Sequence, residues 1–233
     1  MEHPKAEKEA TARMNQPEIN ITADRVLKEC IDITGQRQSG KTKLLEAMLN
    51  MNQNHTYIFD TLGVISADIA KGKVRLFPNQ HIFNPHWMAH ALPDYKARLA
   101  VFLPWCQMVW QRGHCIAVIE EWHLFCNRKY ELPAAFSALF NQGGNKDIAV
   151  WGTSQAPAQC HNDMLRACYH HFVFHLYMPS DLDWMCKFID KDLIKGNPKD
   201  REQMCVKNMP QYHYLYVNTQ TCQSRFYEPI TIW

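Results

Sequence analysis

One eight-residue segment constrains the fold of this chain more than any other feature. The segment GQRQSGKT runs from Gly35 to Thr42 and matches the pattern Gly-x4-Gly-Lys-Thr. In this pattern the glycines let successive backbone N–H groups turn inward around phosphate groups. Because the loop works only when a strand enters it and a helix leaves it, the segment predicts an α/β fold built around a phosphate-binding loop, the P-loop.

The chemistry of the P-loop assigns a role to most of its residues. Lys41 is expected to reach the β- and γ-phosphates as a point charge, and the helix that begins there adds its dipole. Thr42 is expected to give its hydroxyl to Mg²⁺. ATP and Mg²⁺ are therefore the predicted cofactors. The residues predicted to bind the nucleotide are Gly35, Gln36, Arg37, Gln38, Ser39, Gly40, Lys41 and Thr42.

Short apolar runs alternate with helical patterns along the rest of the chain. A strand at 29–34 enters the loop, and a helix at 41–52 leaves it. Further strands are expected at 55–60, 73–77, 115–120, 148–153 and 171–177, and further helices at 94–112 (with Pro104 ending or kinking it), 132–141, 162–168 and 180–189. A C-terminal β-hairpin is expected at 212–218 and 224–228. This alternation predicts the P-loop NTPase fold, with a mostly parallel central sheet and helices on both faces.

Length and composition indicate one globular unit in a reducing compartment. We expect a flexible arm over residues 1–24, which lack apolar periodicity, and a single P-loop ATPase domain over 25–233. The nine cysteines form no CxxC pair and follow no secretory leader, which is typical of reduced thiols in the cytosol. No apolar run is long enough for a transmembrane segment, so we expect a soluble protein. The formal charge of +2 shows no basic excess that would indicate a nucleic-acid partner.

One cluster of metal-ligating residue types has an alternative interpretation. Cys168, His170 and His171 could form a metal site. Adjacent histidines on a strand point to opposite faces, however, and this favours the packed end of a strand.

An acidic pair follows the predicted strand at 115–120. The segment VIEEWHLF places Glu120 and Glu121 after a uniformly apolar run. In a P-loop enzyme, such a pair supplies a carboxylate on the magnesium side and then a base that aligns the attacking water. We predict that Glu120 holds the metal, directly or through water, and that Glu121 orients the water. The alternative is a solvated helix start, and His123 could either face the nucleotide or lie at the surface.

A polar residue follows the next predicted strand, in the segment IAVWGTSQAP. Gln155 stands just past the carboxyl end of this strand, where open α/β sheets bind their ligands. We predict that Gln155 senses the γ-phosphate or holds the attacking water. A polar loop residue before Pro157 is the alternative.

Together, GQRQSGKT, YIFDTLG, VIEEWH and NKDIAVWGTSQAP resemble the FtsK–HerA superfamily of P-loop ATPases. They look most like its compact members, the genome-packaging ATPases of tailless viruses with an internal membrane. The resemblance covers residues 29–177. It assigns Lys41 and Thr42 the phosphate and magnesium roles, Glu120 and Glu121 the acidic pair, and Gln155 the sensor role. Asp60 matches an acidic position that is common in the family.

The chain departs from the family pattern at two points. The family usually has Asp where this chain has Glu120, and the extra methylene favours a longer or water-mediated contact with the metal. The family also often places an arginine shortly before the sensor strand, where it acts on the nucleotide of the neighbouring subunit. The only cation in the segment NQGGNKDI is Lys146, so Lys146, Arg128 and Arg166 are the candidates for this trans-acting role.

The resemblance implies an ATP-driven motor that packages a viral double-stranded DNA genome into a preformed capsid. It further implies a homo-oligomeric ring, expected to be a hexamer, with capsid or portal-vertex proteins as partners. Such a motor works at the virion vertex and in the host cytoplasm. The alternative is a phage assembly or morphogenesis protein that uses nucleotide as a switch and hydrolyses little of it. A small-molecule kinase would normally need an arginine-rich lid after the central strands. This function is disfavoured because the C-terminal third of the chain is poor in arginine.

Overall fold

Eight strands form one sheet in the order β3-β2-β4-β5-β1-β6-β7-β8. The computed structural model describes residues 29–72, 76–85, 94–197, 200 and 203–229. The strands are β1 (Cys30–Thr34), β2 (Thr56–Phe59), β3 (Gln80–Phe83), β4 (Cys115–Ile119), β5 (Ile148–Ser154), β6 (Cys168–Phe174), β7 (Tyr214–Asn218) and β8 (Gln223–Tyr227). The first six strands in this order, β3-β2-β4-β5-β1-β6, are all parallel to one another. The hairpin of β7 and β8 is antiparallel and pairs with β6 through β7. The predicted P-loop NTPase fold is confirmed.

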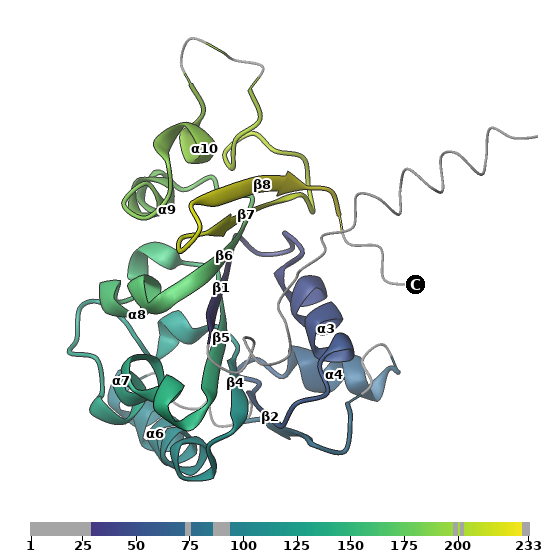
Figure 1. Cartoon of the computed structure of the whole chain (residues 1–233), viewed down its shortest axis with the longest axis vertical. Coiled ribbons are helices and arrows are strands. Elements are labelled where there is room, and N and C mark those ends of the chain that lie inside the picture. Colours follow the sequence, from purple (N-terminus) through teal and green to yellow (C-terminus); the bar gives the residue numbers. More distant parts are fainter. Residues whose placement is uncertain (1–28, 73–75, 86–93, 198–199, 201–202, 230–233) are drawn as a thin grey trace, which may run out of the picture.

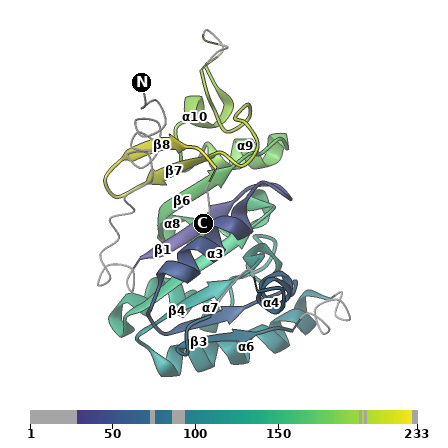
Figure 2. The same ribbon diagram turned by 90° about the vertical axis from the view of Figure 1, so that its right-hand side faces the viewer.

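Helices cover both faces of this sheet (Figure 1). One face carries α3 (Lys41–Met51) and α4 (Val64–Ala70), which lie in front of the sheet in Figure 2. The other face carries α6 (Tyr95–Arg112), α7 (Ala134–Asn141) and α8 (Asn162–Ala167), and α9 (Pro179–Met185) and α10 (Lys191–Lys195) lie beyond them near the hairpin. Three short 3₁₀ helices, η1 (Trp122–Leu124), η2 (Gly143–Lys146) and η3 (Pro157–Gln159), join the larger elements.

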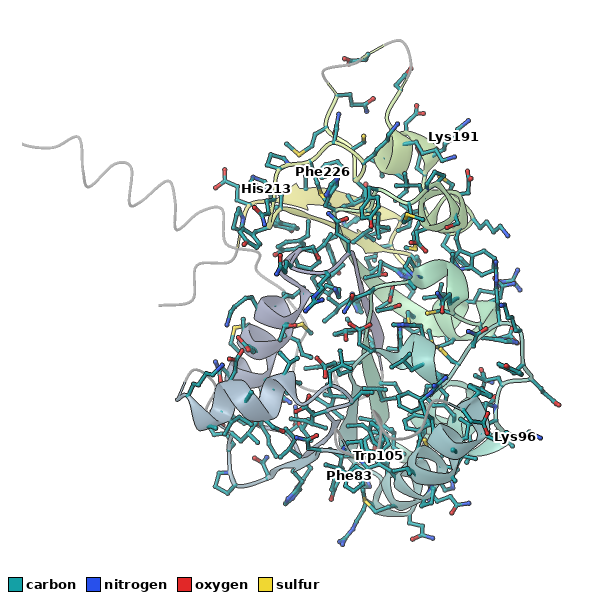
Figure 3. The ribbon with its side chains drawn as sticks, turned by 180° about the vertical axis from the view of Figure 1, so that it is seen from behind. Phe83, Lys96, Trp105, Lys191, His213 and Phe226 are labelled. Carbon is teal, nitrogen blue, oxygen red and sulfur yellow. The ribbon has the colours of Figure 1, made fainter. Side chains whose placement is uncertain are left out.

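The core divides into layers because buried strands alternate their side chains between the two faces. Leu44, Leu45 and Leu49 of α3 pack against Ile31 and Ile33 of β1 on one face. On the other face an aromatic cluster surrounds Phe102 of α6 and includes Phe59, Trp105, Phe125 and Phe136. Figure 3 labels Phe83 of β3 and Phe226 of β8, which lie on the two edge strands of the sheet, together with Trp105 of α6 and His213, which precedes β7.

The two adjacent histidines belong to a packed strand, as predicted. His170 and His171 lie on β6 and contact different partners on the two faces of the sheet. The Nε2 atom of His170 lies 2.7 Å from Glu29 Oε2, and its Nδ1 atom lies 2.8 Å from the Tyr216 hydroxyl. His171 Nδ1 lies 3.2 Å from Oδ2 of the buried Asp32.

Several expected elements differ from the observed ones. The strand predicted at 73–77 is wrong: β2 pairs with Gln80–Phe83 instead, Leu76 and Phe77 lie outside the strands, and residues 73–75 lie outside the described part of the chain. The helix that contains Pro104 does not end there but continues to Arg112. The arm predicted over residues 1–24 also lies outside the described residues. Among the described residues, no helix has the length and apolar character needed to cross a bilayer.

Candidate nucleotide site

Hydrogen bonds join the P-loop to β5 and β6, which come much later in the chain. The loop follows the carboxyl end of β1. Gly35 N donates to Ser154 O at the end of β5, at 3.1 Å, and Gln36 N donates to His175 O just after β6, at 3.1 Å. A Cβ atom at Gly35 would lie 2.5 Å from Phe174 Cβ, closer than van der Waals packing allows. Only glycine therefore fits where the loop passes β6.

The second glycine of the loop begins the helix. Gly40 has a φ of 112° and forms the N-cap of α3. Its positive φ is a conformation that glycine adopts without cost, and a side chain here would approach the ring of Phe174. The first N–H groups of α3 have no carbonyl partner within the helix, so they can donate to an anion.

The residues at the start of α3 form part of the lining of a cavity of about 670 Å³. Its lining residues are Gln38, Ser39, Gly40, Lys41, Thr42, Lys43, Phe174, Tyr212 and Pro229. A cavity of this volume is in the usual range for small-molecule sites.

Two side chains of the loop show that the cavity fits a phosphate. The Oγ atom of Ser39 is buried, and it has no hydrogen-bond partner among the described residues. Lys41 is 6 % exposed, and its Nζ donates to Gln36 O at 3.0 Å. Burial lowers the pKa of Lys41, and the nearby Glu121 and Glu120 partly offset this. A phosphate chain would supply both the acceptor that Ser39 lacks and the counter-charge that favours a protonated Lys41.

The predicted acidic residue Glu121 is held in an unusual backbone conformation. It follows β4 with a φ of 53°, in the left-handed region that non-glycine residues seldom adopt. Its backbone N–H donates to Thr153 Oγ1 at 3.1 Å, which ties it to the neighbouring strand β5. The turn directs the carboxylate toward the residue that follows β5.

That residue is Gln155, the predicted sensor. Its backbone N–H donates to Glu121 Oε2 at 3.0 Å, and its side-chain Nε2 donates to Oε1 at 2.6 Å. The structure thus brings together the two residues that the motifs singled out separately, Glu121 and Gln155.

The carboxylate of Glu121 is buried and ionised. Burial alone would raise its pKa, but His123, Lys41 and Gln155 together lower the pKa below its usual value. His123 Nδ1 lies 3.2 Å from Glu121 Oε2 and 3.2 Å from Ser154 Oγ. His123 therefore contacts Glu121 and Ser154 rather than lying at the surface.

Glu120 has the opposite protonation state from its neighbour. It is 4 % exposed, and its Oε2 accepts a hydrogen bond from Leu62 N at 3.1 Å. Burial raises the pKa of Glu120 to about 9, with further contributions from the carboxyl of Asp60 and from Glu121. Glu120 is thus a neutral acid at pH 7 in the metal-free protein, and a cation beside it would favour the ionised form.

Asp60 is fixed by the element that follows it. Its Oδ2 accepts from both the N–H and the hydroxyl of Ser66, at 2.7 and 2.6 Å, and its Oδ1 accepts from Ile65 N at 3.4 Å. These bonds satisfy N–H groups in the first turn of α4. The same carboxyl group contacts Glu120 and contributes to the raised pKa of that residue.

The candidates for the trans-acting cation lie apart from these residues. Lys146 precedes β5, at the opposite end of the sheet from the P-loop, and its Nζ donates to Trp110 O at 3.1 Å. The guanidinium of Arg128 lies 4.7 Å from the ring centroid of Trp184, and Arg166 is exposed in the last turn of α8. Arg37 is exposed within the P-loop itself.

Some site residues were not predicted from the sequence. Thr153, Ser66, His175 and Tyr212 have no pattern that marks them, because the fold alone brings them to the P-loop and the acidic pair. Asp60 was expected only from the family resemblance.

No protein-family model and no curated protein matches the chain. Solved structures do match. The genome-packaging NTPase B204 from Sulfolobus turreted icosahedral virus 2, in complex with ATP-gammaS, is 15 % identical with a TM-score of 0.65, over 88 % of this chain and 99 % of that one. The DNA-packaging ATPase B204 from Sulfolobus turreted icosahedral virus is 14 % identical with a TM-score of 0.66, over 88 % and 98 % of the two chains. The chain therefore has the fold of these packaging ATPases, and the predicted resemblance is confirmed at the level of the fold.

Proposed function

We propose that this chain is an ATPase whose hydrolysis cycle moves double-stranded DNA, in the packaging of a viral genome into a preformed capsid. The observation that carries the proposal is the ionised, buried carboxylate of Glu121, held by Gln155 next to the P-loop. A base in this state can accept a hydrogen bond from a water molecule and align it for attack on the γ-phosphate.

The phosphate side of the reaction belongs to the P-loop. Lys41 would move from its contact with Gln36 O to the β- and γ-phosphates, and the N–H groups at the start of α3 would donate to the same oxygens. Ser39 would donate its unpaired hydroxyl to the phosphate chain. Each of these donors stabilises negative charge that is spread over the transferred phosphoryl group.

The metal side belongs to Thr42 and Glu120. Mg²⁺, when bound with ATP, would neutralise charge on the β- and γ-phosphates. Thr42 lies at the start of α3 and lines the cavity, and Glu120 lies on the acidic side beside Asp60. These two residues are the ones we propose would hold the metal.

Movement of DNA is the finer part of the proposal. It is supported by the motif order from GQRQSGKT to the sensor Gln155 and by the likeness in fold to B204. We propose that the chain acts as a homo-oligomeric ring, a hexamer in the simplest case, docked on capsid or portal-vertex proteins. In such a ring a cation of one subunit, from Lys146, Arg128 or Arg166, would complete the site of the next.

Steady-state ATP hydrolysis by the purified chain, with and without double-stranded DNA, tests the proposal. We expect DNA to stimulate hydrolysis, and both Glu121→Gln and Lys41→Ala to abolish it. Size-exclusion chromatography in the same buffer reports whether the ring has formed. ATP binding without turnover by an assembled ring, with DNA present, would contradict the motor and favour a nucleotide-switched assembly protein.

A further inference from the structure

We propose that Tyr212 is the platform on which the base of the bound nucleotide stacks, so that the cavity selects nucleoside triphosphates over bare polyphosphate. The proposal rests on the proposed function, because it concerns the same site. It adds a subsite made by the C-terminal part of the chain, which the P-loop and acidic motifs do not include.

The lining of the cavity is of two chemical kinds. The P-loop contributes the polar residues Ser39, Lys41 and Thr42. The aromatic and apolar part comes from Phe174, Tyr212 and Pro229, at the end of β6 and in the segments on either side of the hairpin. A nucleotide has the matching form, because it joins an anionic phosphate chain to an aromatic base.

Tyr212 lies close enough to the P-loop to serve a nucleotide bound there. A Cβ atom built on Gly40 would lie 3.5 Å from Tyr212 Cδ1, so the edge of the ring reaches the backbone of the loop. The residue is nevertheless 47 % exposed. An aromatic ring that borders the cavity and keeps half its surface free can accept another ring against it.

The backbone holds Tyr212 in a defined position. Its φ is 67°, a value that tyrosine rarely adopts and that the surrounding structure must impose. On one side, His213 N donates to Pro210 O at 3.2 Å. On the other, β7 begins with the buried Tyr214, whose ring stacks on Tyr227 with centroids 5.3 Å apart. Tyr212 therefore lies in a turn directly before the folded hairpin.

A histidine joins this segment to the P-loop. His175 Nε2 lies 3.0 Å from Lys207 O, and a carbonyl can only accept, so Nε2 carries the proton. The unprotonated Nδ1 then accepts from Gln36 Nε2 at 2.7 Å. The imidazole of His175 thus links Gln36 of the P-loop to Lys207, in the segment that leads to Tyr212.

Equilibrium binding of two ligands separates a base platform from a structural role. The ligands are Mg²⁺–ATP and inorganic tripolyphosphate with Mg²⁺, which has no base. For Tyr212→Ala we expect ATP affinity to fall about 10- to 100-fold and tripolyphosphate affinity to stay unchanged. Tyr212→Phe keeps the ring and should bind ATP as the unchanged protein does. Tyr177→Ala, which removes an exposed tyrosine that does not line the cavity, is the matched control.

The possible outcomes are distinct. Equal losses for ATP and tripolyphosphate would overturn the inference, because Tyr212 would then only support the P-loop. Unchanged ATP affinity in Tyr212→Ala, with Lys41→Ala still abolishing binding, would also overturn it and leave the nucleotide site intact. If the unchanged protein binds neither ligand, the proposed function itself fails. A circular dichroism spectrum of each variant confirms that it is folded.

Discussion

At the residue scale, Glu121 is the side chain whose chemistry depends most on its neighbours. Its carboxylate remains ionised in a buried position because His123, Lys41 and Gln155 surround it. We expect Glu121→Gln to lower ATP turnover at least about 100-fold, since a neutral amide cannot act as the base. ATP affinity should be nearly unchanged. Phosphate release and equilibrium binding measure the two quantities.

The control for this substitution is Glu131→Gln, which makes the same chemical change at an exposed position. It should leave turnover unchanged. Equal turnover in the two variants would show that Glu121 is not the base.

Glu120 gives a prediction about pH. Its pKa of about 9 in the metal-free protein exceeds the ordinary value of 4.5, so the folded state holds a proton that the unfolded state releases between these values. This contribution to stability is present below pH 4.5 and is lost as pH rises toward 9, with a slope of at most about 1.4 kcal/mol per pH unit. The melting temperature of the metal-free protein should therefore fall more steeply between pH 5 and 9 than that of Glu120→Gln. If the melting temperature falls equally with pH in the two proteins, the raised pKa of Glu120 is contradicted.

At the scale of elements, the contact between β5 and η1 positions the acidic turn. A Cβ atom at Gly152 of β5 would lie 1.9 Å from Trp122 Cε3, and the indole of Trp122 is fully buried. We expect Gly152→Ala to lower the free energy of unfolding by about 3 kcal/mol, because a buried indole cannot move aside without cost. Urea denaturation measures this change. Gly144→Ala, where an added Cβ would meet nothing within 4 Å, should have a much smaller effect.

The elements that could be predicted from the sequence are those with strong apolar runs. The strands around the P-loop and the acidic pair were placed within a residue or two because the segments CIDIT, CIAVI and IAVWGTS are buried along their whole length. The edge strand β3 was misplaced because one of its inward residues is polar. Gln80 is buried, and its side-chain amide donates to Leu49 O and Asn52 O, partners that local sequence cannot reveal.

The same limit applies to the site. The P-loop residues are contiguous in the chain, so the sequence pattern alone predicts them. Glu121 and Gln155 could be predicted as site residues because each follows a predicted strand. The protonation states could not be predicted. They depend on contacts between segments, such as Asp60 with Glu120 and Gln155 with Glu121.

At the scale of the whole molecule, a ring should share its catalytic groups between subunits. We expect that alanine substitution of one of Arg128, Arg166 and Lys146 lowers turnover about 1000-fold or more while ATP affinity persists. Mixing that variant with Glu121→Gln should restore part of the activity, because a chain with an intact base then meets an intact cation. The measurement is phosphate release as a function of mixing ratio. If none of the three substitutions lowers turnover, the trans-acting group lies elsewhere.

The position of β1 between β5 and β6 also determines when the site can form during synthesis. Thr34 at the end of β1 contacts Ser154, which is 120 residues later in the chain, and Gln36 contacts His175 later still. The P-loop therefore leaves the ribosome long before the strands that shape it, and a nascent chain gains ATP affinity only after β6 has emerged. Contacts between such distant residues slow folding, so ATP should act late in folding by stabilising the assembled sheet rather than by guiding the first steps.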